Sequence, residues 1–217
     1  MKLKPIYADI LAIRIISNVH PDMIKKFGLP PNHRSMGMFT ITMDDVGMVA
    51  LDEATKQADV EVAYNHSFYA GSGNASGPLS GEFIGILSST NNEEVRSGID
   101  AIVQTVKSQA HFEALNEEET HALFAHVVPR SGKLLSKEAS IQEGEAIAYL
   151  IAPPLEAMFG IDAALKAADV ELRNLFKPPS ETNFGGGLLT GSQSACEAAA
   201  SAFRDAVITV SEKPTHY

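Results

Sequence analysis

Two adjacent carboxylates and one further acid are the residues of this sequence best suited to do chemistry. Asp44 and Asp45 stand where an apolar segment gives way to helical spacing, and Glu82 begins a predicted strand, where glutamate is not favoured. Paired acids can transfer protons, and they can also attract a small cation. Each acid has a structural alternative: Asp caps helix N-termini and interacts favourably with the helix dipole, and Glu82 can be a solvated strand end.

The other reactive side chains lack the spacing that chemistry requires. His121 and His126 lie in a predicted strand and point to opposite faces of it, which is a poor arrangement for a shared metal ion. Cys196 is the single cysteine, which excludes an internal disulfide and a thiolate cluster, and we expect it to be a small buried apolar residue. We therefore expect no metal site and no cofactor.

Three consecutive glycines, Gly185-Gly186-Gly187, superficially resemble a phosphate-binding loop. No Lys-Ser/Thr pair follows them, so the mechanism of such a loop is missing. Close backbone approach at a subunit contact or a pore is the preferred interpretation.

The composition excludes several classes of function. The formal net charge of −10 argues against nucleic acid, whose binding needs Lys and Arg, and against an anionic membrane surface. No stretch of 18 apolar residues is present, so we expect no membrane span. Asp9 and Arg14 interrupt the apolar run after the N-terminus, so no signal-peptide pattern is expected, and the single cysteine favours a reduced, cytosolic setting.

A long internal repeat determines how the elements are organised. Residues 51–62 read LDEATKQADVEV and residues 161–172 read IDAALKAADVEL, with seven of twelve positions identical. Because the two segments lie about half a chain length apart, the repeat predicts two copies of one domain, here 1–111 and 112–217.

Both halves show the same predicted order of elements, typical of an α/β fold in which helices pack on a sheet, an α+β sandwich. In the first half we predict strands at 6–16, 35–42, 59–64 and 82–88 and helices at 21–27, 44–59 and 92–108. In the second half we predict strands at 122–128, 146–152, 170–176 and 188–190 and helices at 153–168 and 193–207. The connections at 65–78 and 177–187 are glycine-rich loops and 110–119 is the linker.

The two copies differ at the start of the repeated helix. Where the first copy has Asp44-Asp45, the second has Pro154-Leu155, and proline is itself favoured in a first helical turn. Since only one copy uses two charges there, the asymmetry indicates a function that the first copy has and the second lacks.

The repeated segment resembles the signature helix of bacterial microcompartment shell domains. The resemblance extends over essentially the whole chain and is most specific to the tandem-domain shell proteins of ethanolamine utilisation. The motifs that carry it are Asp52–Val62, Phe68-Tyr-Ala-Gly71, Ala125-His-Val-Val128, Ala152-Pro-Pro-Leu-Glu156, 160–166 and Pro179-Ser-Glu-Thr-Asn183.

The resemblance implies an assembly and a location. Each copy would be a circularly permuted shell domain, and three chains would form a pseudo-hexameric homotrimer that packs with other shell proteins into the microcompartment shell in the cytoplasm. Such a protein is not an enzyme. The shell would enclose a cobalamin-dependent ethanolamine lyase, and the trimer would have a gated central pore and smaller pores within each subunit.

The resemblance also implies a set of residues that bind ethanolamine. The acids are Asp44, Asp45 and Glu82, and the aromatic near the domain junction is Phe112, acting mainly through its backbone carbonyl. The loop triplet is Thr182, Asn183 and Phe184, of which the last is often Tyr in relatives. Ethanolamine is an ammonium at neutral pH, so carboxylates in a narrow passage would concentrate it while binding it weakly enough to release.

Two other interpretations remain open at the level of sequence. Asp44, Asp45 and Glu82 could serve a lyase-like small-molecule enzyme, although no nucleophile, metal set or cofactor loop accompanies them. Alternatively, ethanolamine could act as a signal that changes the conformation of the 65–78 and 177–187 loops, since glycine-rich loops have few fixed contacts.

Overall fold

The computed structural model describes residues 3–69 and 79–215 and divides into two compact units. Unit 2 consists of residues 7–110 with Gly132–Leu134, and unit 1 of residues 1–6, 111–131 and 135–217. Each unit is built on its own sheet, and each is described by itself below.

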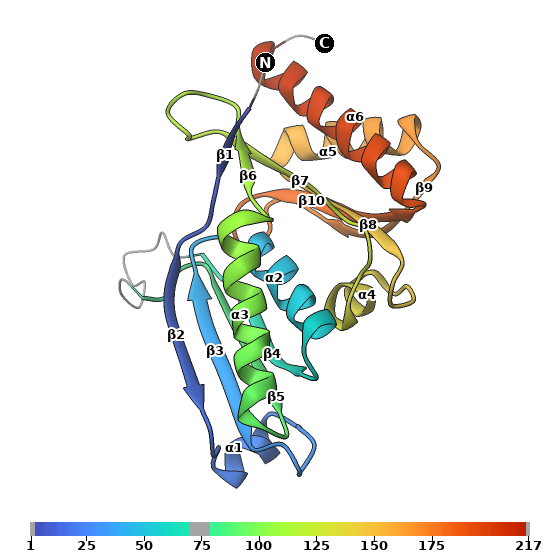
Figure 1. The fold of residues 1–217 in the computed structure, drawn as a ribbon. Helices are drawn as coiled ribbons and strands as arrows, with labels where there is room; N and C mark the ends of the chain where they lie inside the picture. Colours follow the sequence, from blue (N-terminus) through green and yellow to red (C-terminus); the bar gives the residue numbers. More distant parts are fainter. Residues whose placement is uncertain (1–2, 70–78, 216–217) are drawn as a thin grey trace. The chain divides into compact units, whose positions relative to one another are not determined.

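Unit 2 is a four-stranded antiparallel sheet in the order β2-β3-β5-β4, with two long helices on one face (Figure 1). Its strands are β2 (Ile10–Ile16), β3 (Ser35–Ile41), β4 (Glu61–Ser67) and β5 (Phe83–Ser89). Its helices are α1 (Pro21–Lys26), α2 (Asp44–Gln57) and α3 (Asn92–Ser108).

Side-chain alternation along the central strand β3 explains why both faces of this sheet are covered. Gly37 and Phe39 face α3 and α2; a Cβ on Gly37 would lie 2.9 Å from side-chain atoms of Ile99 and Val95. Met36 points to the other face, where it packs in a small cluster with Ile24 of α1. Successive residues of a strand point to opposite faces, so a continuous apolar strand implies a sheet buried on both sides.

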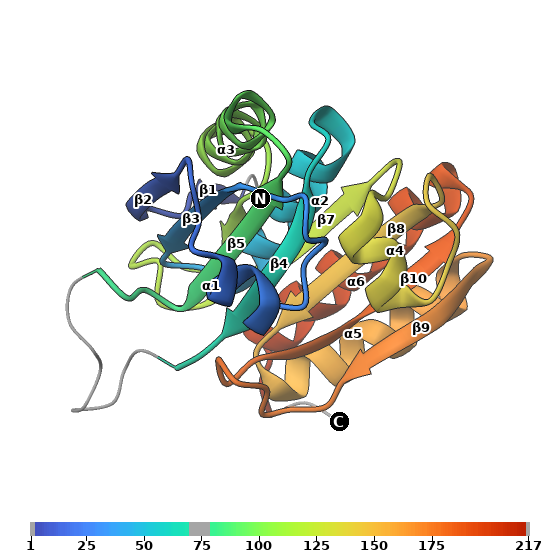
Figure 2. The same ribbon diagram turned by 90° about the horizontal axis from the view of Figure 1, so that it is seen from below.

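Unit 1 repeats this architecture and adds two short strands. Its sheet has the order β1-β6-β7-β8-β10-β9, with α5 and α6 on one face and α4 on the other (Figures 1 and 2). The strands are β1 (Lys4–Ile6), β6 (Phe112–Ala114), β7 (Ala122–Val128), β8 (Ala146–Ala152), β9 (Val170–Phe176) and β10 (Gly185–Gly191). The helices are α5 (Pro154–Ala167), α6 (Gln193–Glu212) and α4 (Lys133–Ala139), of which the first two residues belong to unit 2.

The shared strand order confirms that the chain contains two copies of one fold, because β2-β3-β5-β4 and β7-β8-β10-β9 are the same topology in chain order. The predicted buried role of Cys196 is confirmed as well: it is 0% exposed in the core cluster of unit 1 with Leu150, Phe203 and Val207.

Three element predictions were wrong. The single strand at 6–16 is two strands, β1 and β2, which belong to different sheets and are separated at Tyr7–Asp9. The linker at 110–119 contains strand β6, and the second half contains a helix, α4, that was not predicted.

The glycine triplet Gly185–Gly187 was predicted in a loop but opens strand β10. A Cβ on Gly186 would lie 1.9 Å from the Leu150 carbonyl oxygen, and one on Gly187 would lie 2.6 Å from that of Asn174. Gly186 also has φ of +154°, where other residues are strained. The close approach expected from the glycines is therefore made within the sheet of unit 1, to β8 and β9.

Within the residues that the structure describes, no helix combines the length and the apolar character needed to cross a membrane.

Candidate functional site

The three acids Asp44, Asp45 and Glu82 come to one end of the sheet of unit 2. Strand β3 ends at Ile41, which pairs with Phe83 at the start of the antiparallel strand β5. Glu82 immediately precedes Phe83 and donates its backbone N–H to the Ile41 carbonyl at 2.9 Å. Because helix α2 begins two residues after β3, its first turn lies at the same sheet end.

Close packing fixes the first turn of α2 against the start of β5. A Cβ on Gly47 would lie 2.4 Å from the Phe83 ring, so only glycine permits this approach. The N-cap is Met43, whose side chain makes no capping hydrogen bond, and Asp44 and Asp45 occupy the first helical turn. The two acids therefore interact with the helix dipole without being the cap, which corrects the simplest structural interpretation of the pair.

Three acidic side chains, Asp44, Asp45 and Glu82, concentrate negative charge at this sheet end. Burial raises the pKa of Glu82 above its ordinary value, and the charge of Asp44 raises it further. Asp45 is only 5% exposed. A nearby cation would offset both the desolvation cost of the charged Glu82 and its repulsion from Asp44. The arrangement therefore favours a small positively charged ligand.

A fourth acid at this sheet end, Asp9, was missed from the sequence. Its backbone N–H donates to Thr42 Oγ1 at 2.9 Å, and its carbonyl accepts from the Thr42 N–H at 3.1 Å. The available signal was the interruption of the apolar run 6–16 by an aspartate. Its pairing with Thr42 is a long-range contact that spacing does not reveal.

The remaining predicted residues lie in unit 1, where two aromatic rings form the contact between them. Phe112 of β6 is 7% exposed, and its ring meets Phe184 edge-on at a centroid distance of 6.0 Å and an interplanar angle of 74°. Phe112 also contacts Phe124 at 5.0 Å. Edge-to-face pairs of this kind are a favoured aromatic geometry, so they hold Phe184 against β6.

The loop triplet is a compact turn closed by its own hydrogen bonds. Ser180 donates its N–H to the Phe184 carbonyl at 2.8 Å, and the Asn183 N–H donates to the Ser180 carbonyl at 3.1 Å. Asn183 has φ of +68°, a left-handed conformation that asparagine tolerates, and it is exposed, whereas Thr182 is buried. The turn thus presents the Asn183 side chain to solvent.

The structure therefore brings the predicted residues together as two sets, the acids in unit 2 and the Phe112–Phe184 set in unit 1. The scattered histidines join neither set: His121 contacts Glu156 at 3.1 Å, and His126 stacks on Phe124. In the part of the chain that the structure describes, no group of three or more His, Cys, Asp and Glu side chains is arranged to hold a metal ion.

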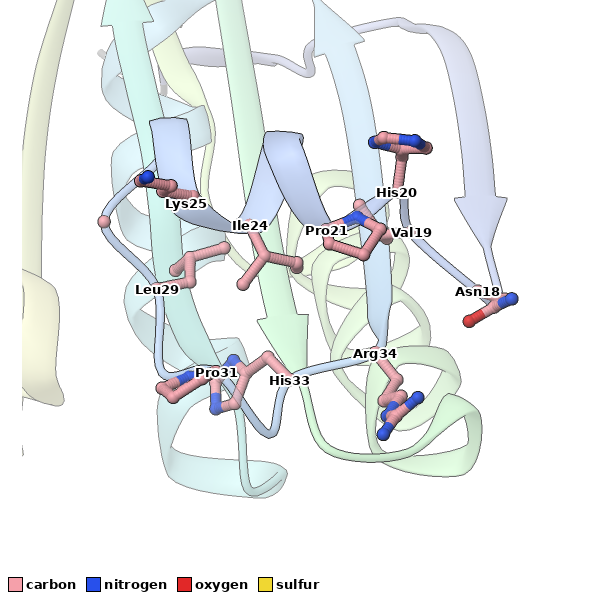
Figure 3. Close-up of a pocket in the computed structure, with 11 residues that line it drawn as sticks. Asn18, Val19, His20, Pro21, Ile24, Lys25, Leu29, Pro31, His33 and Arg34 are labelled. Atoms are coloured by element: carbon pink, nitrogen blue, oxygen red, sulfur yellow. The ribbon is translucent and has the colours of Figure 1, made fainter.

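A basic pocket lies at the opposite end of the sheet of unit 2 and was not predicted. It has a volume of about 840 Å³ between α1 and the segment that leads to β3 (Figure 3). Ile24 lies near its centre, with Lys25 and Arg34 on opposite sides. Its lining contains no acidic residue: Asn18, Val19, His20, Pro21, Ile24, Lys25, Gly28, Leu29, Pro31, His33 and Arg34.

Comparison with known proteins identifies the family. A family model described as the BMC domain matches residues 35–117. The chain is 54% identical over 214 residues to the bacterial microcompartment shell protein EutL of Clostridium perfringens, and the match covers 99% of each chain. This chain belongs to the EutL family of bacterial microcompartment shell proteins.

Solved structures agree with membership in the EutL family. The ethanolamine utilization protein EutL of Leptotrichia buccalis superposes with a TM-score of 0.96 at 55% identity and full coverage of both chains. The shell protein PduB, described as trimeric, has a TM-score of 0.78 at 18% identity, covers 94% of this chain and 89% of its own, and shows the same fold.

The EutL family assignment decides two questions that the sequence left open. Members are structural proteins of the microcompartment shell rather than enzymes, so the lyase-like alternative for Asp44, Asp45 and Glu82 is set aside. The place of this chain is the shell itself.

Proposed function

We propose that this chain is a shell tile of an ethanolamine-utilisation microcompartment and that it assembles as a homotrimer whose two domains per chain, 1–111 and 112–217, imitate a hexamer. The names of its EutL relatives support the ethanolamine pathway. The tandem repeat supports the trimer, because two similar units per chain fill a sixfold arrangement with three chains. Other shell proteins are its neighbours in the shell.

We further propose that Asp44, Asp45 and Glu82 bind ethanolamine through its ammonium group and pass it through a small pore. The observation that carries this proposal is that Glu82 and the first turn of α2 meet at one end of the sheet, where burial and the charge of Asp44 raise the pKa of Glu82. Phe112, Thr182, Asn183 and Phe184 complete the proposed site, with the exposed Asn183 amide and the Phe112 carbonyl as partners for the ligand hydroxyl.

Gating of the larger central opening belongs to the same proposal. The Ser180–Phe184 turn closes its hydrogen bonds within itself, so it can move as one piece once the ring contact between Phe184 and Phe112 is released. The second predicted gate, at 65–78, lies mostly outside the described residues. Ligand-dependent movement of the turn would make ethanolamine both cargo and signal.

Calorimetric titration of ethanolamine into the wild-type protein and Asp45→Ala tests the site, with the oligomeric mass measured by light scattering on the same samples. We expect a trimer that binds weakly and a trimeric mutant that does not bind. A wild-type trimer without binding would contradict the pore site and return Asp44 and Asp45 to a purely structural role. A stable monomer would contradict the assembly.

A further inference from the structure

The basic pocket of unit 2 has no part in the function proposed above. Its volume of about 840 Å³ is that of a small-molecule site. Ile24, near its centre, is 6% exposed, and Leu29 adds a second, half-buried apolar side chain to the lining. Lys25 and Arg34 lie on opposite sides of Ile24 (Figure 3). The pocket therefore combines an apolar surface with two cationic side chains.

Backbone hydrogen bonds hold the walls of this pocket in place. The Arg34 carbonyl accepts from the Val19 N–H at 2.8 Å, and the Arg34 N–H donates to the carbonyl of the last residue of β5 at 3.0 Å. After α1, Gly28 turns the chain with φ of +67°, and the Leu29 N–H donates to the Ile24 carbonyl at 3.1 Å. A pocket with fixed walls loses little conformational entropy when a ligand binds.

The two cationic side chains have no acidic partner in the chain. Among the residues that the structure describes, neither Lys25 nor Arg34 forms an ion pair, although the net charge of the chain is −10. The lining contains no acid, and Oδ2 of the neighbouring Asp22 lies 3.6 Å from Nδ1 of His20 instead. Positive charge without local compensation attracts an anion.

The second copy shows that the fold does not require a basic residue in the place of Arg34. The hydrogen bond between Val19 and Arg34 has its counterpart in unit 1, where the Ser131 N–H donates to the Glu145 carbonyl at 2.9 Å. Glu145 therefore stands where Arg34 does, and its carboxylate accepts from the Gln142 N–H at 2.7 Å. An acid that closes its own loop in one copy is replaced by an unpaired base in the other, which indicates that Arg34 serves a ligand.

We propose that this pocket binds an organic phosphate, with the phosphate group held by Lys25 and Arg34 and the carbon body of the ligand on Ile24 and Leu29. A phosphate monoester carries about two negative charges at neutral pH, which suits two cations. Arginine binds phosphate through two parallel N–H donors. Both cationic side chains are long and exposed, so their charged ends can turn toward one group.

The phosphate site is independent of the proposed ethanolamine site. The pocket lies beside the Ser89 end of β5, whereas the acids lie at the Phe83 end of the same strand. The two ends also carry opposite charge, so one would attract an anion and the other a cation. Loss of either site by mutation should leave the other intact.

Calorimetric titration of phenyl phosphate into the full-length protein, in a phosphate-free buffer of low ionic strength, tests the pocket. We expect binding, and weaker binding of two probes that each lack one feature: benzoate, a monoanion of similar shape, and inorganic phosphate, which has no carbon body. Absence of phenyl phosphate binding would overturn the inference. Benzoate that binds as tightly would overturn the choice of phosphate, and inorganic phosphate that binds as tightly would overturn the role of the apolar surface.

The second copy supplies a matched control for Lys25. The hydrogen bond between Leu29 and Ile24 has its counterpart between the Ile141 N–H and the Ser136 carbonyl at 2.9 Å. The next residue of α4, Lys137, therefore stands where Lys25 does on α1, and it is also exposed. Lys137→Ala removes the same charge from the protein without touching the basic pocket.

Three variants separate the pocket from a general attraction of anions to the protein. Lys25→Ala and Arg34→Ala should each weaken phenyl phosphate binding about tenfold, because each removes a charge-assisted contact. Lys137→Ala should leave the affinity unchanged. All three side chains are exposed, so the circular dichroism and the mass by light scattering should stay those of the wild type. Equal weakening by the three variants, or none by Arg34→Ala, would overturn the inference.

Discussion

Helices α2 and α5 have the same length, the same place in the fold and the same signature sequence, yet they start differently. Helix α2 begins with Asp44-Asp45 after an N-cap without a side-chain hydrogen bond, and α5 begins with Pro154-Leu155. The second copy forms the helix with Pro154 and a single first-turn acid, Glu156, so a pair of adjacent acids is not required to start it. Their presence in one copy only, beside the half-buried Glu82, is consistent with the cation site proposed above.

The largest effect we expect is at the aspartate that both helices share. Asp52→Ala removes the acceptor of a buried N–H and should lower the free energy of unfolding by about 2 kcal/mol, the cost of leaving such a group unsatisfied. Asp162→Ala removes an exposed side chain and should cost less than about 0.5 kcal/mol. Urea denaturation of the two variants and the wild type measures this difference. Equal losses of stability for the two variants would contradict the difference in burial between the two aspartates, whose side chains are 1% exposed at Asp52 and 58% exposed at Asp162.

The second effect concerns the acids that only α2 carries. Asp45→Asn keeps the shape of the side chain and removes its charge, so it should weaken ethanolamine binding about tenfold, or about 1.4 kcal/mol. Asp59→Asn, at an exposed acid beyond the end of α2, is the matched control and should change binding little. Equal weakening by both variants in calorimetry would mean that net charge, rather than this site, attracts the ligand.

These comparisons also show what the sequence could and could not predict. The repeat predicted α2 and α5 because the helix period and the shared residues are local information. Helix α4 was missed because its first N–H groups are satisfied by Asp52 and Thr55, which lie far away in the chain. Asp9 was missed at the candidate site for the same reason, since its partner Thr42 belongs to another strand end.

The glycine triplet shows a different limit. Glycine is disfavoured in strands, so local propensity predicted a loop at Gly185–Gly187. The close approach of β10 to the backbone of β8 required glycine there, and this requirement exists only in the folded sheet. The acids Asp44, Asp45 and Glu82 were singled out by residue type and position, and the family resemblance then assigned them a ligand. The register of β3 and β5 supplies the physical reason that they lie at one sheet end.

A third, smaller effect follows from Glu82. Its pKa is raised in the folded state, so the folded protein holds this proton more tightly than the unfolded chain does. The resulting stabilisation is present below the ordinary pKa of 4.5, and it is lost as the pH rises through the raised pKa. At pH 7 the charged, half-buried carboxylate destabilises the folded state. Glu82→Gln should therefore stabilise the protein at pH 7 by about 0.5 kcal/mol, after allowance for solvent screening.

Thermal unfolding of wild type and Glu82→Gln between pH 4 and pH 8 measures this effect, and the gain should shrink as the pH falls. Ethanolamine should bind the wild type more weakly over the same fall, because protonation of Glu82 removes an attractive charge from the ammonium. A Glu82→Gln variant that is less stable than wild type at pH 7 would show that the carboxylate already has a compensating partner.

The smallest effect we expect is at the aromatic contact in unit 1. Phe184→Tyr adds a hydroxyl and keeps the ring that meets Phe112 edge-on, so the free energy of unfolding should change by less than about 0.5 kcal/mol. If this residue acts through its ring or backbone, ethanolamine affinity should change less than twofold, because substitutions at the surface usually change free energies by less than about 0.5 kcal/mol. A clear gain in affinity would instead show that a phenolic hydroxyl contacts the ligand, and that the acids of α2 act together with the Ser180–Phe184 turn.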